Sequence, residues 1–327
     1  MRELVAAVVI GAPFLVGASM APDRDGQVVF RFADPEIIES SGLVVAGGLV
    51  VTVNDSGDGA RVYTVDLGTG RTVGVTSFSG EAFDDEALAP AGRGRVWVGD
   101  IGDNGRARSS VTVTRVPFGR SDLDVEGDAF ELTYPGGPAD AEALLSHPVT
   151  GGLYVVTKEA FGGTVFEAPA SLSASRPNRL RAIGDAPGVV TDGSFFPDGR
   201  HLVLRNYGQA AVFGFPGLEE VGSFELPAQQ QGEGISVAPD GQVYASSEGV
   251  RSPLLRIALP EEIRQAMAPA EPTATPTPTP SESPQPEGPD PSVATEEDTE
   301  RDPVPWLIGG GVALAGLLVL LRALRPR

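Results

Sequence analysis

A short segment that begins with an acidic residue recurs five times in this chain. Each copy continues into an apolar stretch, a turn and a second apolar stretch, and successive copies lie roughly 40 to 56 residues apart. A repeat of this length is typical of a β-propeller, in which each repeat forms one blade. The acidic residues are Glu39, Glu86, Glu142, Asp192 and Glu233. This position begins the innermost strand of a blade, so we expect all five acids to surround one axis.

The pattern inside each repeat also favours strands. In the second repeat, residues 86–90, 95–98, 110–116 and 129–134 are runs rich in Val, Thr, Phe and Tyr, bounded by Gly, Pro and Asp. The first four repeats each contain four such runs, but the fifth contains only three. Residues 27–32 form an extra run before the first repeat. We therefore predict an all-β, five-bladed propeller whose fifth blade is completed by this N-terminal strand. Six blades is the alternative, if the long second repeat contains a further unit.

The N-terminal end has the composition of a targeting segment. Residues 1–21 combine Arg2 with an apolar run and small residues, which is typical of a secretory signal peptide. An uncleaved N-terminal anchor is the alternative. The propeller itself is assigned to residues 22–260.

The C-terminal end resembles a stalk and a membrane anchor. Residues 261–303 are rich in Pro, Thr, Ser and Glu and are predicted to be a disordered stalk, with a short helix at 261–267. Residues 304–321 carry no charge and are long enough to cross a bilayer as one transmembrane helix. The basic residues of 322–327 favour a cytoplasmic C-terminus. We expect a single-pass protein of the cell membrane with its propeller outside the cell.

Charge and cysteine content narrow the possible partners. The chain has no cysteine and a formal net charge of −20, and residues 22–265 contain 34 acidic against 19 basic residues. This balance argues against binding to nucleic acid. An exported domain without disulfides must be stabilised by its core, by ring closure or by bound metal.

Further acidic residues occupy the loops between the second and third strands of the repeats. In a propeller these loops lie at the same end as the acids that begin the innermost strands, and Asp84 and Asp140 belong to this end too. Crowded carboxylates either retain protons at raised pKa or bind a cation. Oxygen ligands on Gly-rich loops suit Ca²⁺, whereas zinc prefers His and Cys. The predicted metal ligands are Glu39, Asp55, Asp58, Asp85, Glu86, Asp100, Asp103, Glu142, Asp192 and Glu233. A turn role is the alternative for any single Asp-Gly or Asn-Gly among them.

Two basic residues fall in the same set of loops. Lys158 is the only lysine of the chain, and Arg205 is expected one blade away. With their neighbours Glu159 and Asn206 they form the predicted ligand-binding residues, because two cations beside a metal can hold a phosphate or carboxylate. A surface Lys–Glu pair is the alternative. The chain has no cysteine and no G-x-S-x-G motif, so nucleophilic catalysis is not indicated.

Several of these motifs are similar to those of known propellers. The segments 54–58, 84–88 and 99–104 resemble an uncharacterised family of exported bacterial β-propeller proteins. The segments 140–144 and 232–235 resemble propellers of the phytase and esterase-like-phytase type and, more distantly, of the gluconolactonase type. This resemblance implies a cation site, with Ca²⁺ as its metal, on one acidic face. It also implies six blades, from which the predicted five depart.

Two functions follow as hypotheses. The first is a membrane-anchored binding or sensing module that holds a cation and a small anionic or cell-envelope ligand. The second is a Ca²⁺-dependent hydrolase of phosphoesters or lactones, with Glu142 or Glu233 as the catalytic general base. A purely structural role in the envelope is a third. The binding module is preferred because no set of catalytic groups is complete.

Overall fold

Short antiparallel strands make up nearly all of the regular structure in the part of the chain that the computed structural model describes, which is residues 26–55, 57–80 and 82–269. The predicted signal peptide, most of the predicted stalk, the predicted transmembrane helix and the basic tail lie outside the described residues. Within the described residues, no helix is long and apolar enough to cross a membrane.

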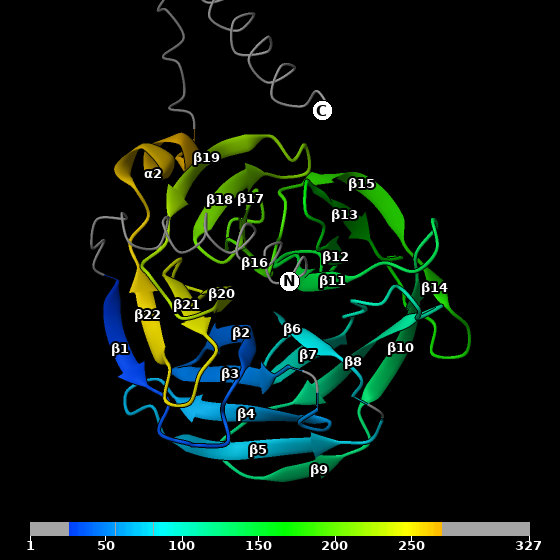
Figure 1. The fold of residues 1–327 in the computed structure, drawn as a ribbon, viewed down its shortest axis with the longest axis horizontal. Coiled ribbons are helices and arrows are strands. Elements are labelled where there is room, and N and C mark those ends of the chain that lie inside the picture. Colours follow the sequence, from blue (N-terminus) through cyan, green and yellow to red (C-terminus); the bar gives the residue numbers. More distant parts are fainter. Residues whose placement is uncertain (1–25, 56, 81, 270–327) are drawn as a thin grey trace, which may run out of the picture. The chain divides into compact units, whose positions relative to one another are not determined.

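The described strands form five sheets arranged as blades around a centre (Figure 1). Blade 1 contains β2 (Ser40–Ala46), β3 (Leu49–Asn54), β4 (Arg61–Asp66) and β5 (Thr72–Phe78). Blade 2 contains β6 (Asp85–Pro90), β7 (Arg95–Asp100), β8 (Val111–Pro117) and β10 (Asp128–Thr133). Blade 3 contains β11 (Ala141–Ser146), β12 (Leu153–Thr157), β13 (Gly163–Glu167) and β15 (Arg181–Ala186).

The remaining two blades follow the same order. Blade 4 contains β16 (Asp192–Phe195), β17 (His201–Arg205), β18 (Gln209–Gly214) and β19 (Glu220–Glu225). Blade 5 contains β20 (Gly232–Val237), β21 (Val243–Ser247) and β22 (Pro253–Ile257), to which β1 (Gln27–Arg31) adds the outer strand. The all-β, five-bladed architecture is therefore confirmed for the described residues, and the alternative of six blades is wrong.

The N-terminal strand closes the ring as predicted. β1 pairs antiparallel with β22, with Gln27 opposite Arg256 and Phe30 opposite Leu254. The buried Phe30 and Phe32 pack in one apolar cluster with Leu254 and with residues of blade 1. The fifth blade thereby gains its fourth strand, and the edge of β22 is covered instead of exposed.

Two very short strands cross to a neighbouring blade, which the sequence did not predict. β9 (Leu123–Val125) leaves blade 2 and pairs parallel with β5 of blade 1. β14 (Asn178–Arg179) leaves blade 3 and pairs parallel with β10 of blade 2. The extra length of the second repeat is thus used as a fifth strand on blade 1. The chain lies so close there that a Cβ on Gly74 would stand 2.4 Å from the carbonyl oxygen of Gly119.

Each interface between neighbouring blades contains its own apolar cluster. Side chains alternate across a strand, so successive residues of an innermost strand pack on opposite neighbours. In β11, Leu144 joins the cluster shared with blade 2, whereas Leu145 joins the cluster shared with blade 4. The described residues form five such clusters, one for each pair of adjacent blades. The core is therefore a ring of sheet-to-sheet contacts around the axis.

The chain continues from blade 5 into the short helix α2 (Glu261–Met267), in agreement with the expected helix at 261–267. Pro260 precedes its first turn, where the missing backbone donor of proline costs nothing. Ile263 is buried against Gly222 of β19, so the helix packs on the outer strand of blade 4.

Candidate functional site: an acidic cluster at one end of the axis

The five innermost strands, β2, β6, β11, β16 and β20, lie around the centre of the ring (Figure 1). All five run in the same direction along the axis because each blade repeats the same strand order. Their first residues therefore meet at one end of the axis, which we call the acidic end. The loops from second to third strands of the blades meet there as well.

A β-bulge places an acidic side chain at the start of three of these strands. The antiparallel pairing shifts register at Glu86 in β6, at Glu142 in β11 and at Glu233 in β20. A bulge leaves one residue unpaired and redirects its side chain, and bulges are common beside functional sites. All three glutamates are buried, with 3%, 3% and 4% of their surface exposed.

The other two predicted acids do not occupy a bulge. The bulge of β2 contains Ser41, whose hydroxyl donates to Glu86 Oε2 at 3.1 Å, so serine occupies the position expected for an acid in blade 1. Glu39 lies two residues earlier and is only half-buried. β16 has no bulge, and Asp192 is fully buried while accepting hydrogen bonds from the amides of Gly193 and Ile235, both at 2.7 Å. Asp192 therefore joins blades 4 and 5.

Three carboxylates come close enough to share one cation. Asp55, Asp84 and Glu86 each offer an oxygen, and these oxygens all lie within 4.8 Å of one another. Asp55 and Glu86 belong to the predicted ligand set, and Asp84 had been placed only on the acidic face. A Cβ on Gly102 would stand 2.4 Å from Asp84 Oδ2, so glycine at 102 leaves the room that this carboxylate occupies.

The electrostatics of this cluster favour positive charge. Burial, followed by the charges of Glu142, Asp55 and Asp84, raises the pKa of Glu86 to about 10. Burial and then Asp55 and Asp140 raise the pKa of Asp84 to about 6. Such shifts mean that the carboxylates repel one another in a partly desolvated space.

Lys158 supplies the positive side chain closest to the buried glutamates. Its Nζ donates to Glu142 Oε1 at 2.5 Å and lies 5.4 Å from the ring centre of Tyr207. Burial raises the pKa of Glu142 to about 8, although the charge and hydrogen bond of Lys158 oppose the rise. Burial alone would lower the pKa of Lys158, but Glu142 raises it, so Lys158 stays charged. This is a partly buried ion pair, with 21% of the lysine side chain exposed.

One carboxylate oxygen of Glu233 lacks a hydrogen-bond partner in the described part of the chain. Gln231 Nε2 donates to Glu233 Oε1 at 3.0 Å and to Glu248 Oε1 at 2.6 Å. Among the described residues, nothing hydrogen-bonds to the buried Glu233 Oε2. Burial raises the pKa of Glu233 against the opposing effects of Gln231, Lys158 and Arg205. Burial, Glu233 and Glu39 raise the pKa of Glu248 to about 7. Buried acceptors in folded proteins normally have a partner, so this oxygen marks a polar position at the acidic end.

Three predicted metal ligands, Asp58, Asp100 and Asp103, contact residues close to them in the chain, and a fourth, Asp85, lies beside Asp100. Asp58 pairs with Arg61 and accepts from the Tyr63 hydroxyl at 3.1 Å. Asp100 forms two hydrogen bonds with the Arg108 guanidinium, at 2.8 and 2.7 Å. Asp103 accepts from the amides of residues 107 and 108 and fixes that loop. Asp85 is buried beside Asp100, and burial followed by that charge raises its pKa to about 7.

The predicted ligand-binding residues separate into two groups. Lys158 lies at the acidic cluster. Arg205 is 1% exposed, and its guanidinium donates to the carbonyl oxygens of Asn206, Tyr207, Gly234 and Ser246, so it fastens blade 4 to blade 5.

The two neighbours of these basic residues have local partners. The carboxylate of Glu159 lies 3.6 Å from Arg106, within an exposed ion pair. Asn206 Oδ1 accepts from the amides of Gly208 and Gln209, which is a turn contact. Sequence reasoning missed Ser41, Tyr207 and Gln231, and no motif distinguishes these polar residues from ordinary loop residues.

No protein-family profile and no curated protein matches the sequence. The chain is similar to the hydrazine synthase of Kuenenia stuttgartiensis over 63% of its own length and 61% of that chain, at 12% identity and a TM-score of 0.36. It thus spans less than two thirds of that chain. It is also similar to a glucose dehydrogenase over 70% of its own length and 99% of that chain, at 11% identity and a TM-score of 0.43. Both similarities are too low to assign an activity.

Proposed function

We propose that the acidic end of the axis binds a hard divalent cation, expected to be Ca²⁺, and presents it to an anionic ligand. The observation that carries this proposal is the convergence of Asp55, Asp84 and Glu86, whose oxygens lie within 4.8 Å of one another. Carboxylate oxygens on loops and bulges are the ligands that Ca²⁺ prefers, and it takes six to eight of them.

A second observation supports a cation over simple protonation. The buried Glu233 Oε2 has no hydrogen-bond partner among the described residues, and the charge of Asp55 contributes to its raised pKa. A protonated carboxyl would supply one hydrogen at one place, whereas a cation with its waters supplies positive charge to several oxygens together. Asp55 and Asp84 are only half-buried, so the cluster opens to solvent.

The ligand is expected to be an anion because three protein carboxylates leave most of the Ca²⁺ coordination sphere for water or a ligand. Lys158 stands beside the cluster, with 21% of its side chain exposed. A phosphate or carboxylate bound to the cation would approach this ammonium group and gain a charge-assisted hydrogen bond. In this proposal the propeller is a binding or sensing module.

The test is thermal unfolding of the full-length chain in EDTA and in Ca²⁺, together with metal analysis. Binding at 100 times Kd stabilises by about 2.7 kcal/mol, or roughly 5–10 °C in Tm for a domain of this size. Glu86→Gln and Asp55→Asn should abolish the Ca²⁺-dependent shift. The matched controls Glu126→Gln and Asp124→Asn change exposed acids of the β9 segment and should retain it. No metal and an unchanged Tm in the wild type would rule the proposal out.

Hydrolysis is the second candidate, and one observation favours it. Glu142 has a pKa raised to about 8 and touches the charged Lys158, so a group able to exchange protons near neutral pH lies at the cation cluster. A Ca²⁺-polarised phosphoester or lactone would be attacked by water with Glu142 as base. Turnover would appear as Ca²⁺-dependent release of phosphate or ring-opened lactone that Glu142→Gln abolishes. Ligand binding without turnover would exclude hydrolysis and favour the binding or sensing module.

The proposed setting is the outer face of a membrane. A span at 304–321 and the Pro-rich stalk before it would tether the propeller to the bilayer. Protease added to intact cells should then release the propeller, whereas release only after lysis would contradict this placement.

A further inference from the structure

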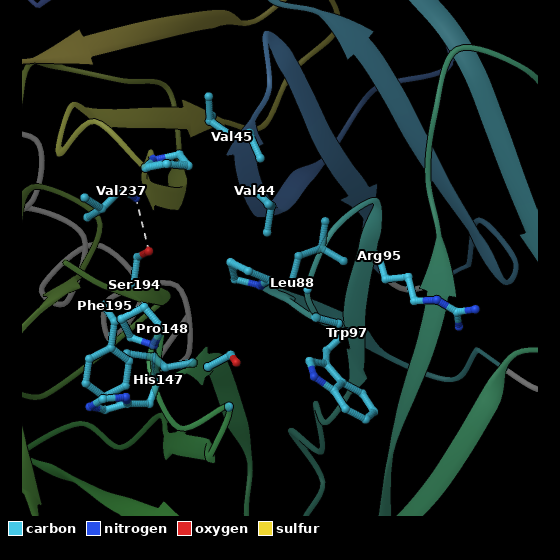
Figure 2. A pocket seen from close by; sticks show the side chains of 18 of the residues that line it. Val44, Val45, Leu88, Arg95, Trp97, His147, Pro148, Ser194, Phe195 and Val237 are labelled. Atoms are coloured by element: carbon cyan, nitrogen blue, oxygen red, sulfur yellow. Dashed lines mark hydrogen bonds between the residues drawn. The ribbon is translucent and has the colours of Figure 1, made fainter. Parts of the chain in front are cut away.

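The opposite end of the axis contains a cavity of about 1000 Å³, which the function proposed above does not use. It is lined by the second halves of the innermost strands and by the turns that follow them. Figure 2 shows Val44, Leu88, Phe195 and Val237 converging on it from four different blades. The acids lie near the first residues of the same strands. The four steps along the strand from Glu86 to Pro90 span about 13 Å at about 3.3 Å per residue, so the two sites are separate.

The shape and surface of the cavity fit the apolar part of a small molecule. Most of its surface is apolar, and its volume lies at the upper end of the range for ligand pockets. Exposed prolines form much of the rim, at the end of the innermost strand or in the turn after it in four blades. They are Pro90, Pro148, Pro197 and Pro239. Proline loses little entropy on ordering, so this rim is rigid before a ligand arrives.

The charge of the lining distinguishes this cavity from the rest of the molecule. The described residues that line it include Arg93, Arg95, Arg115 and His147 but no acidic residue. The whole chain has 44 acidic against 24 basic residues, so a lining with bases alone is a marked departure. Asp128, outside the lining, pairs with Arg95 at 3.6 Å and with Arg115 at 2.8 Å. Arg93 is exposed and has no ion pair with any described residue.

We infer that this cavity binds an amphipathic anion, with an apolar chain or ring system among the axial side chains and a carboxylate or phosphate at Arg93. Burial of apolar ligand surface supplies the larger part of the affinity, at about 25 cal/mol per Å². The guanidinium selects the charge of the head group, because Arg presents several donors in a geometry that matches carboxylate and phosphate. An organic cation of the same length would meet Arg93 instead of an acid.

Trp97 lines the cavity and provides a local reporter. It is 9% exposed, and the chain has only two tryptophans. The Trp306→Phe chain in lipid nanodiscs therefore reports Trp97 alone, with nanodiscs lacking protein as the blank for partition into lipid. The probes are 8-bromooctanoate, 8-bromooctanol and (8-bromooctyl)trimethylammonium, because bromine quenches indole fluorescence only at contact.

Saturable quenching by 8-bromooctanoate is expected, with weaker binding of the alcohol and weakest binding of the ammonium compound. Arg93→Gln should weaken octanoate binding about fivefold and Arg93→Glu more, while binding of the alcohol stays unchanged in both. The control Arg71→Gln changes an exposed arginine of blade 1 and should leave all three affinities unchanged. Unchanged far-UV circular dichroism would show that the variants fold.

Three outcomes would overturn the inference. The first is quenching that rises linearly without saturation. The second is equal affinity for the anion and the ammonium compound. The third is an Arg93→Gln variant that binds the anion as well as the parent chain does. Because none of these readouts involves Ca²⁺, they are independent of the function proposed for the acidic end.

Discussion

Three buried glutamates, Glu86, Glu142 and Glu233, meet at the acidic end, and their ionisation determines how the metal-free ring responds to pH. Each has a raised pKa with burial as its first cause. The folded state therefore holds protons that the unfolded chain has already lost. Among these three, Glu142 forms a direct ion pair with Lys158, and Glu233 feels that lysine's charge only at longer range. The remaining charge must be removed by protons or by a cation.

In EDTA, the free energy of unfolding should fall as pH rises. The pKa of Glu86 moves from 4.5 to about 10, so within that window the native state binds more protons than the unfolded state and stability decreases with pH. One such proton corresponds to about 1.4 kcal/mol per pH unit, or about 3–5 °C in Tm. Scanning calorimetry between pH 5 and 9 measures this slope. Glu86→Gln should flatten this pH dependence, whereas the control Glu126→Gln should not. A Tm that rises with pH would contradict the raised pKa of Glu86.

The sequence predicted that an acidic end exists, but it did not predict correctly which residues form it. A recurring acid before each innermost strand predicted the five positions, and Glu86, Glu142 and Glu233 lie where expected. Asp192 also begins its innermost strand, but its carboxylate accepts hydrogen bonds from backbone amides, and Glu39 precedes the bulge of its strand. In β2 the bulge contains Ser41, and β16 has none. Bulges depend on contacts between strands, so spacing along the chain cannot specify them.

At the scale of elements, the crossing strands β9 and β14 attach neighbouring blades to each other. β9 carries the chain from blade 2 along the outer edge of blade 1, and β14 carries it from blade 3 to blade 2. Both are parallel additions of three and two residues. Such short runs have no periodicity to detect, which is why the second repeat suggested a sixth blade.

Gly74→Ala tests the docking of the β9 segment. Its Cβ would stand 2.4 Å from the Gly119 carbonyl oxygen and 2.6 Å from that of Ser121, so the segment must move outward. Overpacking of this kind costs about 1–3 kcal/mol. Gly105→Ala is the control because nothing lies within 4 Å of its Cβ. We expect Gly74→Ala to lower Tm and to speed amide hydrogen exchange at residues 123–125, and no change in exchange there would refute the close approach.

Phe32→Ala tests the closing strand. Phe32 is fully buried and packs with Leu43 and Leu254, so its truncation loses contacts with blades 1 and 5 together. The expected cost is about 3–5 kcal/mol in the free energy of unfolding, measured by urea titration. Val149→Ala removes an exposed apolar side chain and should change stability little. A similar small effect for both variants would mean that β1 contributes little to closure.

At the scale of the whole molecule, charge is divided along the axis. The acidic end gathers crowded carboxylates, whereas the described lining of the opposite cavity contains bases and no acids. With a net charge of −20, the metal-free chain is destabilised by its own repulsion. The composition predicted this acidity. It did not predict that acids and bases gather at opposite ends of the axis, because the order of blades around the ring decides which loops meet.

Added NaCl should therefore stabilise the metal-free protein. Raising ionic strength from about 0.01 to about 0.5 M shortens the screening length from about 30 Å to a few ångströms, so repulsion between exposed acids declines. At pH 8 in EDTA, Tm should rise by several degrees, and by less in saturating Ca²⁺. Sodium chloride is used because the divalent cations of other chloride salts would bind at the proposed site. A Tm lowered by NaCl would show that attractive pairs outweigh the repulsion.

Closure by β1 also sets an order of events during biosynthesis. Phe30 pairs with Leu254, so the strand made first finds its partner only after nearly all of the ring has been synthesised. At roughly 5–20 residues per second, the ribosome leaves this strand without its partner for on the order of 10–40 s. Until then β1 is an unpaired, aromatic-containing segment able to associate with other chains. A nascent copy must therefore remain open or chaperoned until β22 emerges, and a chain without β1 would leave β22 as an exposed edge.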